Sequence, residues 1–114
     1  MVSEWKGKWA LVTGASAGIG VALAEELAAG GTHLVLTARR LDRLQEIADS
    51  LRKKYAIQTH VVAANLAKRD APQEIFAFTK EKGLRIDLLI NNAGFGQYGE
   101  VPQVETERLL DMWK

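Results

Sequence analysis

The sequence predicts an α/β fold, in which an open, doubly wound parallel sheet carries helices on both faces. Short apolar runs that suit buried strands alternate with helical patterns along the chain. Successive strand-like runs are separated by about ten residues or more, enough for a parallel crossover through a helix. Two glycine-containing stretches directly follow strand-like runs, and ligands bind at that end of the strands in such sheets.

The first half of the chain contains two strand–helix units. Residues 9–13 form a continuous apolar run and are predicted to be a strand buried on both faces. A glycine-rich turn leads to a helix over 21–29, which two glycines end. Residues 34–37 predict a second strand. The clearest helix covers 41–55, because apolar residues recur there every three or four positions: Leu41, Leu44, Ile47, Ala48, Leu51 and Tyr55.

The second half continues the alternation. A third strand is predicted over 58–64. A helix over 70–82 follows, with Asp70 as its N-cap and a proline in its first turn. A fourth strand covers 86–90. We then expect a loop rich in glycine (Gly94, Gly96 and Gly99) and a fourth helix over 104–114. The sheet should therefore contain about four parallel strands.

Length and composition exclude several classes of protein. The 114 residues suit one domain, and 47% hydrophobic with 25% charged residues is typical of a globular chain. The formal net charge of +1 gives no indication of a nucleic-acid partner. There are no cysteines, so a disulfide framework is excluded and we expect no metal site. The longest uncharged run, 9–24, is shorter than the ~20 apolar residues of a membrane span. We expect a cytoplasmic protein without a membrane partner.

The stretch 13–20 (T-G-A-S-A-G-I-G) has competing interpretations. Small residues let a backbone approach a phosphate closely, and the following helix directs its N–H groups and positive dipole end toward the turn. Residues 14–18 also fit G-x-S-x-G, the nucleophile elbow of a serine hydrolase that would use Ser16. An elbow needs a histidine base, and the chain has only His33 and His60. We favour a phosphate loop with G-x-x-x-G-x-G spacing over the hydrolase, and over an ordinary turn.

The end of the second strand indicates which dinucleotide would bind. Dinucleotide folds that bind NAD usually carry an acidic residue about 20 positions after the glycines, where it binds the ribose hydroxyls. Position 38 is alanine, and Arg39 and Arg40 follow. Guanidinium groups bind a 2′-phosphate through several donors. The sequence therefore predicts NADP(H) as cofactor, with a solvated basic corner as the alternative.

The two glycine-containing stretches together resemble a known family. The T-G-x-x-x-G-x-G motif of 13–20 and the N-N-A-G motif of 91–94 resemble the N-terminal half of a short-chain dehydrogenase/reductase of the short, non-extended branch. The resemblance covers nearly the whole chain. It implies a Rossmann-type sheet with strand order 3-2-1-4, in which the fourth strand is an edge where a fifth strand should pair. An open apolar edge favours self-association, so we expect a homo-oligomer.

The resemblance also implies a set of cofactor-binding residues. In the glycine loop these are Gly14, Ser16, Ala17, Gly18, Ile19 and Gly20, around the diphosphate and the adjacent ribose. After the second strand, Arg39 and Arg40 would bind the 2′-phosphate. After the third strand, Asn65, with Leu66, would face the adenine amine, where the family usually has aspartate. After the fourth strand, Asn91, Ala93 and Gly94 would lie beside the nicotinamide-side ribose.

The family's catalytic set is not present in these residues. It comprises an asparagine, a serine, and the tyrosine and lysine of Tyr-x-x-x-Lys. Tyr55 and Tyr98 are followed four residues later by Thr59 and Pro102, so neither begins such a motif. The resemblance implies that all four catalytic residues lie beyond Lys114, and we name no catalytic residue within the chain.

The resemblance therefore describes one part of a larger unit. We expect residues 1–114 to be the NADP-binding N-terminal portion of one Rossmann domain without its catalytic half. The whole protein would be an NADP(H)-dependent oxidoreductase acting on a small carbonyl or alcohol. A non-catalytic nucleotide-binding or assembly module is the alternative.

Overall fold

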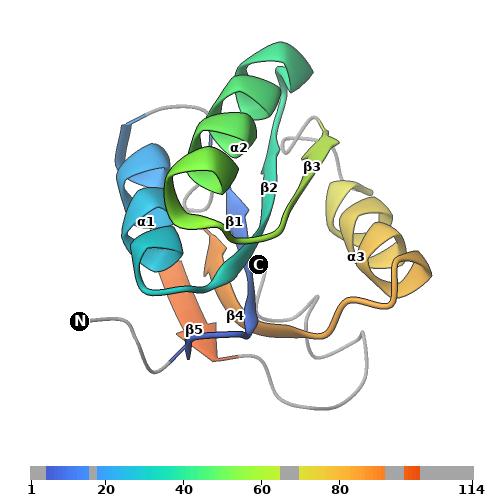
Figure 1. Cartoon of the computed structure of the whole chain (residues 1–114). Coiled ribbons are helices and arrows are strands. Elements are labelled where there is room, and N and C mark those ends of the chain that lie inside the picture. Colours follow the sequence, from blue (N-terminus) through green and yellow to red (C-terminus); the bar gives the residue numbers. More distant parts are fainter. Residues whose placement is uncertain (1–4, 16–17, 65–69, 92–96, 101–114) are drawn as a thin grey trace.

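The structure is a computed structural model that describes residues 5–15, 18–64, 70–91 and 97–100 (Figure 1). It contains a five-stranded sheet in the order β3-β2-β1-β4-β5. The first four strands pair in parallel, which confirms the predicted α/β class and the order 3-2-1-4. The strands are β1 (Trp9–Thr13), β2 (His33–Ala38), β3 (Thr59–Ala63), β4 (Ile86–Asn91) and β5 (Gln97–Glu100). The helices are α1 (Gly18–Ala29), α2 (Leu41–Tyr55) and α3 (Ala71–Glu81).

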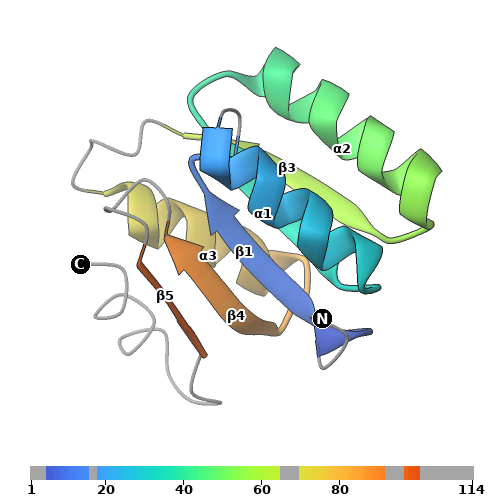
Figure 2. The same ribbon diagram turned by 90° about the vertical axis from the view of Figure 1, so that its left-hand side faces the viewer.

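The helices are divided between the two faces of the sheet (Figure 2). The chain moves in one direction from β1 to β2 to β3, so right-handed crossovers place α1 and α2 on the same face. It then returns across the sheet to β4, on the other side of β1, and α3 covers the opposite face. Because of this reversal, β1 lies between β2 and β4. The helix before β2 is α1, on one face, and the helix before β4 is α3, on the other.

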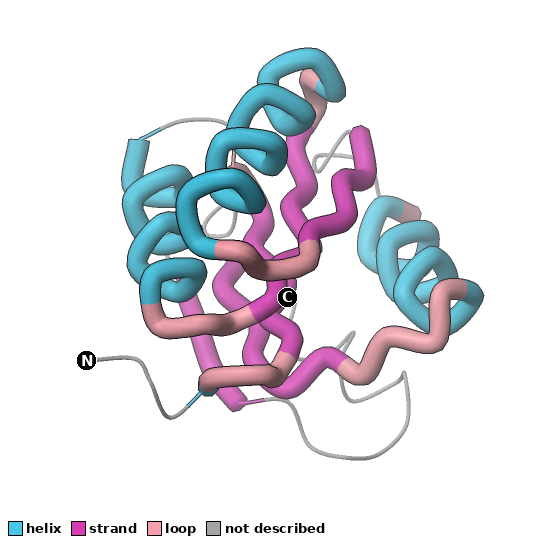
Figure 3. Tube along the Cα trace, viewed as in Figure 1, coloured by secondary structure: helices cyan, strands magenta, loops and turns pink. Residues whose placement is uncertain are grey.

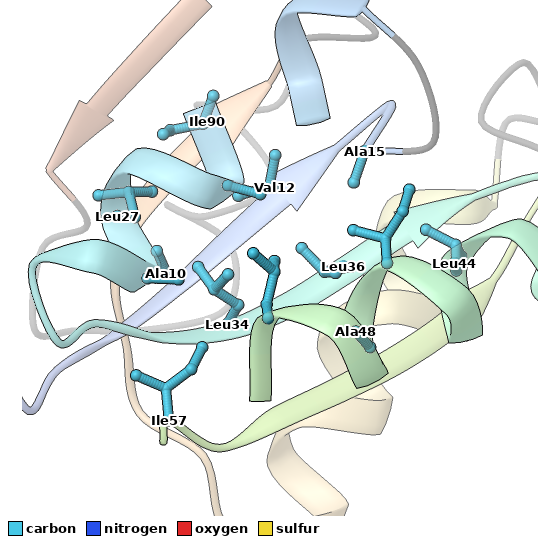
Figure 4. Packing of buried hydrophobic residues seen from close by; sticks show 14 of the residues in the cluster. Ala10, Val12, Ala15, Leu27, Leu34, Leu36, Leu44, Ala48, Ile57 and Ile90 are labelled. Carbon is cyan, nitrogen blue, oxygen red and sulfur yellow. The ribbon is translucent and has the colours of Figure 1, made fainter. Parts of the chain in front are cut away.

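Each face buries its own hydrophobic cluster. The larger cluster lies between the sheet and the pair α1 and α2 (Figure 4). It includes Val12, Leu34, Leu36, Leu44 and Ile90. The smaller cluster lies under α3 and is formed mainly by Leu11, Val35, Ile75, Phe76, Ile86 and Leu89. Alternate residues of β1 and β2 therefore contribute to opposite faces, which is why these strands are apolar without a break.

The predicted helices form with small changes at their ends. In α2 the expected stripe is buried at Leu44, Ile47, Ala48 and Leu51, whereas Leu41 is exposed. The first helix begins at Gly18, three residues earlier than expected, because the glycine turn itself supplies the first helical turn. The third helix has its N-cap at Asp70 as predicted and the proline in its first turn, but the carboxylate makes no capping hydrogen bond.

The fourth strand is not the edge of the sheet. Part of the expected glycine-rich loop, residues 97–100, forms β5 and pairs antiparallel with β4. Ile90 lies opposite Tyr98, and Asn91 opposite Gln97. The returning chain pairs with the backbone of β4, so the prediction of an open fourth strand is wrong.

Two further predictions are not tested by the fold. The helix predicted to run from position 104 to Lys114 lies outside the described residues. Self-association through the fourth strand or that helix therefore stays a prediction, although the pairing of β5 with β4 removes the open edge on which part of it depended.

Across the described ranges, none of the helices is both long enough and apolar enough to cross a membrane.

Candidate cofactor site

The candidate site lies at the edge of the sheet where the parallel strands end. β1 ends at Thr13, β2 at Ala38 and β4 at Asn91, and Thr13 is in register with both Thr37 and Asn91. The turn after β1 and the start of α2 lie at this same edge (Figure 3). β1 is the strand at which the order reverses, and such switch points are where open α/β sheets bind ligands.

Glycines shape the turn between β1 and α1. Gly14 has a φ of +63° and Gly18 a φ of +56°, a left-handed conformation that side chains disfavour. Gly20 is required for a different reason. A Cβ atom at Gly20 would lie 2.2 Å from the carbonyl oxygen of Gly14. The first turn of α1 therefore packs directly on the backbone of the turn, and only glycine fits between them.

This turn fits the diphosphate of a dinucleotide. A Cβ atom at Gly18 would meet nothing within 4 Å, so the backbone is open on that side. The first turn of α1 contains no acidic residue that would repel an anion. The free N–H groups and the positive dipole end of a helix favour an anion there. The turn is held in place by Ala15, whose N–H donates to the carbonyl oxygen of Thr37 at 3.2 Å.

The two arginines after β2 are both exposed but differ in their contacts. Arg40 is the N-cap residue of α2, and its guanidinium donates to Asp42 Oδ2 at 3.1 Å. This hydrogen bond holds the pKa of the Asp42 carboxyl below its usual range. Arg39 forms no ion pair within the described ranges. Arg39 is therefore more available than Arg40 to bind a phosphate. The interpretation of the sequence missed the pairing of Arg40 with Asp42, although Asp42 lies only two residues after Arg40.

Asn91 is brought next to the turn by strand pairing. It is the last residue of β4, and its backbone pairs with Thr13, the last residue of β1. The Thr13 hydroxyl donates to the carbonyl oxygen of Ile90 at 3.4 Å, which joins the two strands at this edge. The remaining predicted residues, Ser16, Ala17, Asn65, Leu66, Ala93 and Gly94, lie outside the described residues, and of Ile19 only the backbone in α1 is described.

The histidines lie far from the candidate site. His33 begins β2 and His60 is the second residue of β3, so both are at the edge where the strands start. Their rings flank Trp9, with centroids 5.2 Å and 5.5 Å from the indole. A nucleophile elbow in the turn after β1 would need a histidine base at the edge where the strands end, beside that turn. Within the described residues there is none, so the geometry disfavours the hydrolase.

Comparison with known proteins agrees with this geometry. The family model for short chain dehydrogenases matches residues 8–113. The very-long-chain 3-oxoacyl-CoA reductase of Bos taurus is 38% identical over 93 residues, which are 82% of this chain and 29% of that protein. The chain spans 28% to 39% of the length of the curated relatives it matches.

Solved structures of reductases resemble the fold. The L-sorbose reductase of Gluconobacter frateurii, solved with NADPH and L-sorbose, is 36% identical with a TM-score of 0.77, over 95% of this chain and 41% of that one. The alcohol dehydrogenase of Thermococcus sibiricus, solved with 5-hydroxy-NADP, is 34% identical with a TM-score of 0.69, over 72% of this chain and 35% of that one. The chain therefore belongs to the short chain dehydrogenase family of oxidoreductases.

Proposed function

We propose that these residues form the NADP(H)-binding part of an oxidoreductase that acts on a carbonyl or alcohol substrate. The nicotinamide cofactor would supply the hydride chemistry. The chain's own contribution is to bind and orient the dinucleotide at the carboxyl edge of the sheet. Substrate contacts and proton transfer would require residues other than those that the structure describes, and the placement of the catalytic asparagine, serine, tyrosine and lysine beyond Lys114 stays a prediction.

The observation that carries the proposal is the turn between β1 and α1. Gly14 and Gly18 have left-handed backbone conformations in it, and Gly20 lets the start of α1 pack on its backbone. The N-terminus of α1, which carries no acidic residue in its first turn, then lies at the edge of the sheet where β1 and β4 end. These features suit a diphosphate, because the backbone offers N–H donors without competing side chains.

The exposed Arg39 supports NADP(H) over NAD(H). It follows β2 directly, at the place where a carboxylate would bind the ribose of NAD. A guanidinium there attracts the 2′-phosphate, and a carboxylate would repel it. The solved structures with NADPH and 5-hydroxy-NADP are relatives at the family level, and they agree with this choice of cofactor.

A titration of NADP⁺ and NAD⁺ against Arg39→Ala tests the cofactor. We expect this variant to lose roughly 1.5–3 kcal/mol of NADP⁺ binding free energy, the scale of a charged hydrogen bond, with little change for NAD⁺. Arg43→Ala is the matched control, because Arg43 is also exposed and carries the same charge but lies in an ion pair with Glu46 in α2. Equal losses for both dinucleotides in Arg39→Ala would refute the choice of NADP(H).

We also propose that the 114 residues, assayed alone, bind cofactor without turnover. Neither Tyr55 nor Tyr98 is followed by a lysine four positions later, so these residues lack the family's acid–base pair. In that case the isolated chain acts as a nucleotide-binding module. NADPH consumption with a panel of ketones and aldehydes, measured by absorbance, should not exceed the buffer rate, and a rate above it would contradict this proposal.

A further inference from the structure

Arg40 is an unusual residue for the place that it occupies in the fold. It is the N-cap of α2, with a φ of −105° and a ψ of 107°, and its carbonyl oxygen accepts the N–H of Leu44 at 3.2 Å. Helix N-caps favour side chains that accept a hydrogen bond, whereas a cation there lies at the positive end of the helix dipole. The Arg40 side chain makes no capping hydrogen bond. The local structure of α2 therefore does not account for an arginine at this position.

The side chain of Arg40 is held by a carboxylate on the same helix. Its Nη2 donates to Asp42 Oδ2 at 3.1 Å, and Asp42 lies in the first turn of α2. Both side chains are exposed, Arg40 to 74% and Asp42 to 70%. Exposed ion pairs are weak, because water solvates each charge when the pair separates. Another anion in solution can therefore compete with Asp42 for this guanidinium.

The pair lies beside the cation proposed to bind the 2′-phosphate. β2 ends at Ala38, Arg39 follows, and Arg40 then caps α2 at the edge where the parallel strands end (Figure 3). A phosphate and a carboxylate accept the same N–H donors of a guanidinium. The 2′-phosphate of a bound cofactor and the carboxylate of Asp42 would thus compete for Arg40.

We propose that Asp42 is a positioning residue that limits the preference for NADP(H), an inference that rests on the proposed NADP(H) function. Its carboxylate holds Arg40 over the first turn of α2 and so withholds a second guanidinium from the 2′-phosphate. Arg39 then carries most of the selection for NADP(H), and Arg40 contributes only when its ion pair with Asp42 opens. NAD(H) has no 2′-phosphate, so its affinity does not depend on this competition.

Asp42→Asn should therefore bind NADP⁺ more tightly than the parent chain. We expect a gain in affinity of about two- to fivefold, the scale of an exposed ion pair, and the same gain for 2′,5′-ADP, which also carries the 2′-phosphate. The affinity for NAD⁺ should not change. Damage to α2 would weaken the binding of every nucleotide, so a gain confined to ligands with a 2′-phosphate distinguishes this role from a structural one. Calorimetric titration at one fixed ionic strength measures all three affinities.

A double-mutant cycle tests whether the carboxylate acts through Arg40. Arg40→Ala alone should cost less NADP⁺ affinity than Arg39→Ala, because Arg40 is already paired. In the Arg40→Ala background, Asp42→Asn should bring no gain. Glu46→Gln is the matched control. It also frees an exposed arginine of α2, since Glu46 pairs with Arg43 at 3.7 Å, and it should leave both affinities unchanged.

Four results would overturn the inference while the proposed function stands. They are an unchanged NADP⁺ affinity in Asp42→Asn, an equal gain for NAD⁺, a gain that persists in the Arg40→Ala background, and the same gain in Glu46→Gln. If the parent chain bound neither NADP⁺ nor 2′,5′-ADP, the proposed function itself would fail, and this inference with it.

Discussion

At the scale of single residues, the site depends on backbone that side chains must not obstruct. Gly18 and Gly20 lie two positions apart but are needed for different reasons. Gly18 has a positive φ, and a Cβ atom there would have open space around it. Gly20 has no positive φ, but its surroundings leave no space for a Cβ atom. A methyl group at Gly20 would meet the carbonyl oxygen of Gly14, which is backbone and cannot rotate away. The start of α1 would then have to move off the turn.

We therefore expect Gly20→Ala to reduce the free energy of unfolding by about 1–3 kcal/mol, the usual cost of an overpacked position. It should also weaken NADP⁺ binding, because the displaced helix start would no longer direct its N–H groups toward the proposed diphosphate position. Urea denaturation and cofactor titration measure the two effects. Gly83→Ala is the control: unlike Gly20, Gly83 has a positive φ, and a Cβ atom there would meet nothing within 4 Å. It should lose some stability and no affinity, and similar behaviour of the two variants would contradict the role given to Gly20.

Single residues could be predicted from sequence only where the signal is local. The glycine spacing of 13–20 predicted a turn that requires glycine, and the positive φ of Gly14 and Gly18 and the close packing at Gly20 confirm that requirement. Phosphate binding by this turn stays a prediction. The pairing of Arg40 with Asp42 was not predicted, and neither was the buried hydroxyl of Thr37, which has no hydrogen-bond partner among the described residues. Both depend on which partners the folded chain brings within reach, and a residue's type alone does not determine that.

At the scale of elements, α2 combines a strong apolar stripe with an unfavourable end. Its buried residues hold it against the sheet, and Arg52, Lys53 and Lys54 in its last turn suit the negative end of its dipole. The C-cap residue is Ala56, with a φ of +56°, and its N–H donates to Arg52 O. Helices usually place glycine in this left-handed conformation, because Cβ is strained there.

Ala56→Gly should therefore stabilise the chain by about 0.5–1 kcal/mol, since relief of the left-handed strain exceeds the extra entropy of glycine in the unfolded chain. Chemical denaturation measures the change. Ala77→Gly, at an exposed position inside α3, is the opposite control and should destabilise by about 1 kcal/mol. Destabilisation by both substitutions would show that the end of α2 carries no such strain.

Elements with their own periodicity were predictable, and β5 was not. The helix over 41–55 and the four parallel strands follow from runs of apolar residues, and their ends differ from prediction by a few residues at most. Residues 97–100 (Q-Y-G-E) contain a glycine and no apolar run, so they read as loop. They form a strand because β4 offers an unpaired backbone beside them, which is a property of the folded sheet.

At the scale of the whole molecule, an aromatic cluster packs at the edge opposite the candidate cofactor site. Trp9, His33 and His60 come from β1, β2 and β3, and Phe78 of α3 contacts His60 edge-on at 5.9 Å. Burial, and secondarily the positive charge of Lys82, lower the pKa of His60 from its ordinary value of 6.5. Protonating His60 therefore opposes the packing of three strands and a helix.

This arrangement predicts how stability depends on pH. The unfolded chain binds a proton at His60 more readily than the folded chain, so this contribution is complete above 6.5 and is lost as the pH falls from 6.5 through the lower pKa of the folded state. His60→Gln should flatten the decline in unfolding free energy over that interval. Lys82→Ala should flatten it only in part, because burial is the larger cause. An unchanged pH profile in His60→Gln would contradict the assignment.

The overall topology was predictable because it follows from few physical rules. Alternating strands and helices imply parallel pairing, and right-handed crossovers then decide which face each helix covers. The strand order itself came from the resemblance to a family, since parallel pairing alone leaves the order open. Neither these rules nor the resemblance predicted that the chain reverses direction and forms β5 antiparallel to β4.

The sheet also partitions the interior into two compartments. The cluster under α1 and α2 and the cluster under α3 are separate sets of residues on opposite sides of one layer of backbone. Changes at distant sites without common partners contribute nearly additively to stability. Substitutions in the two compartments should therefore combine nearly additively where their side chains are distant and share no partner. Such changes on the α3 side would then leave the packing behind the proposed phosphate turn undisturbed.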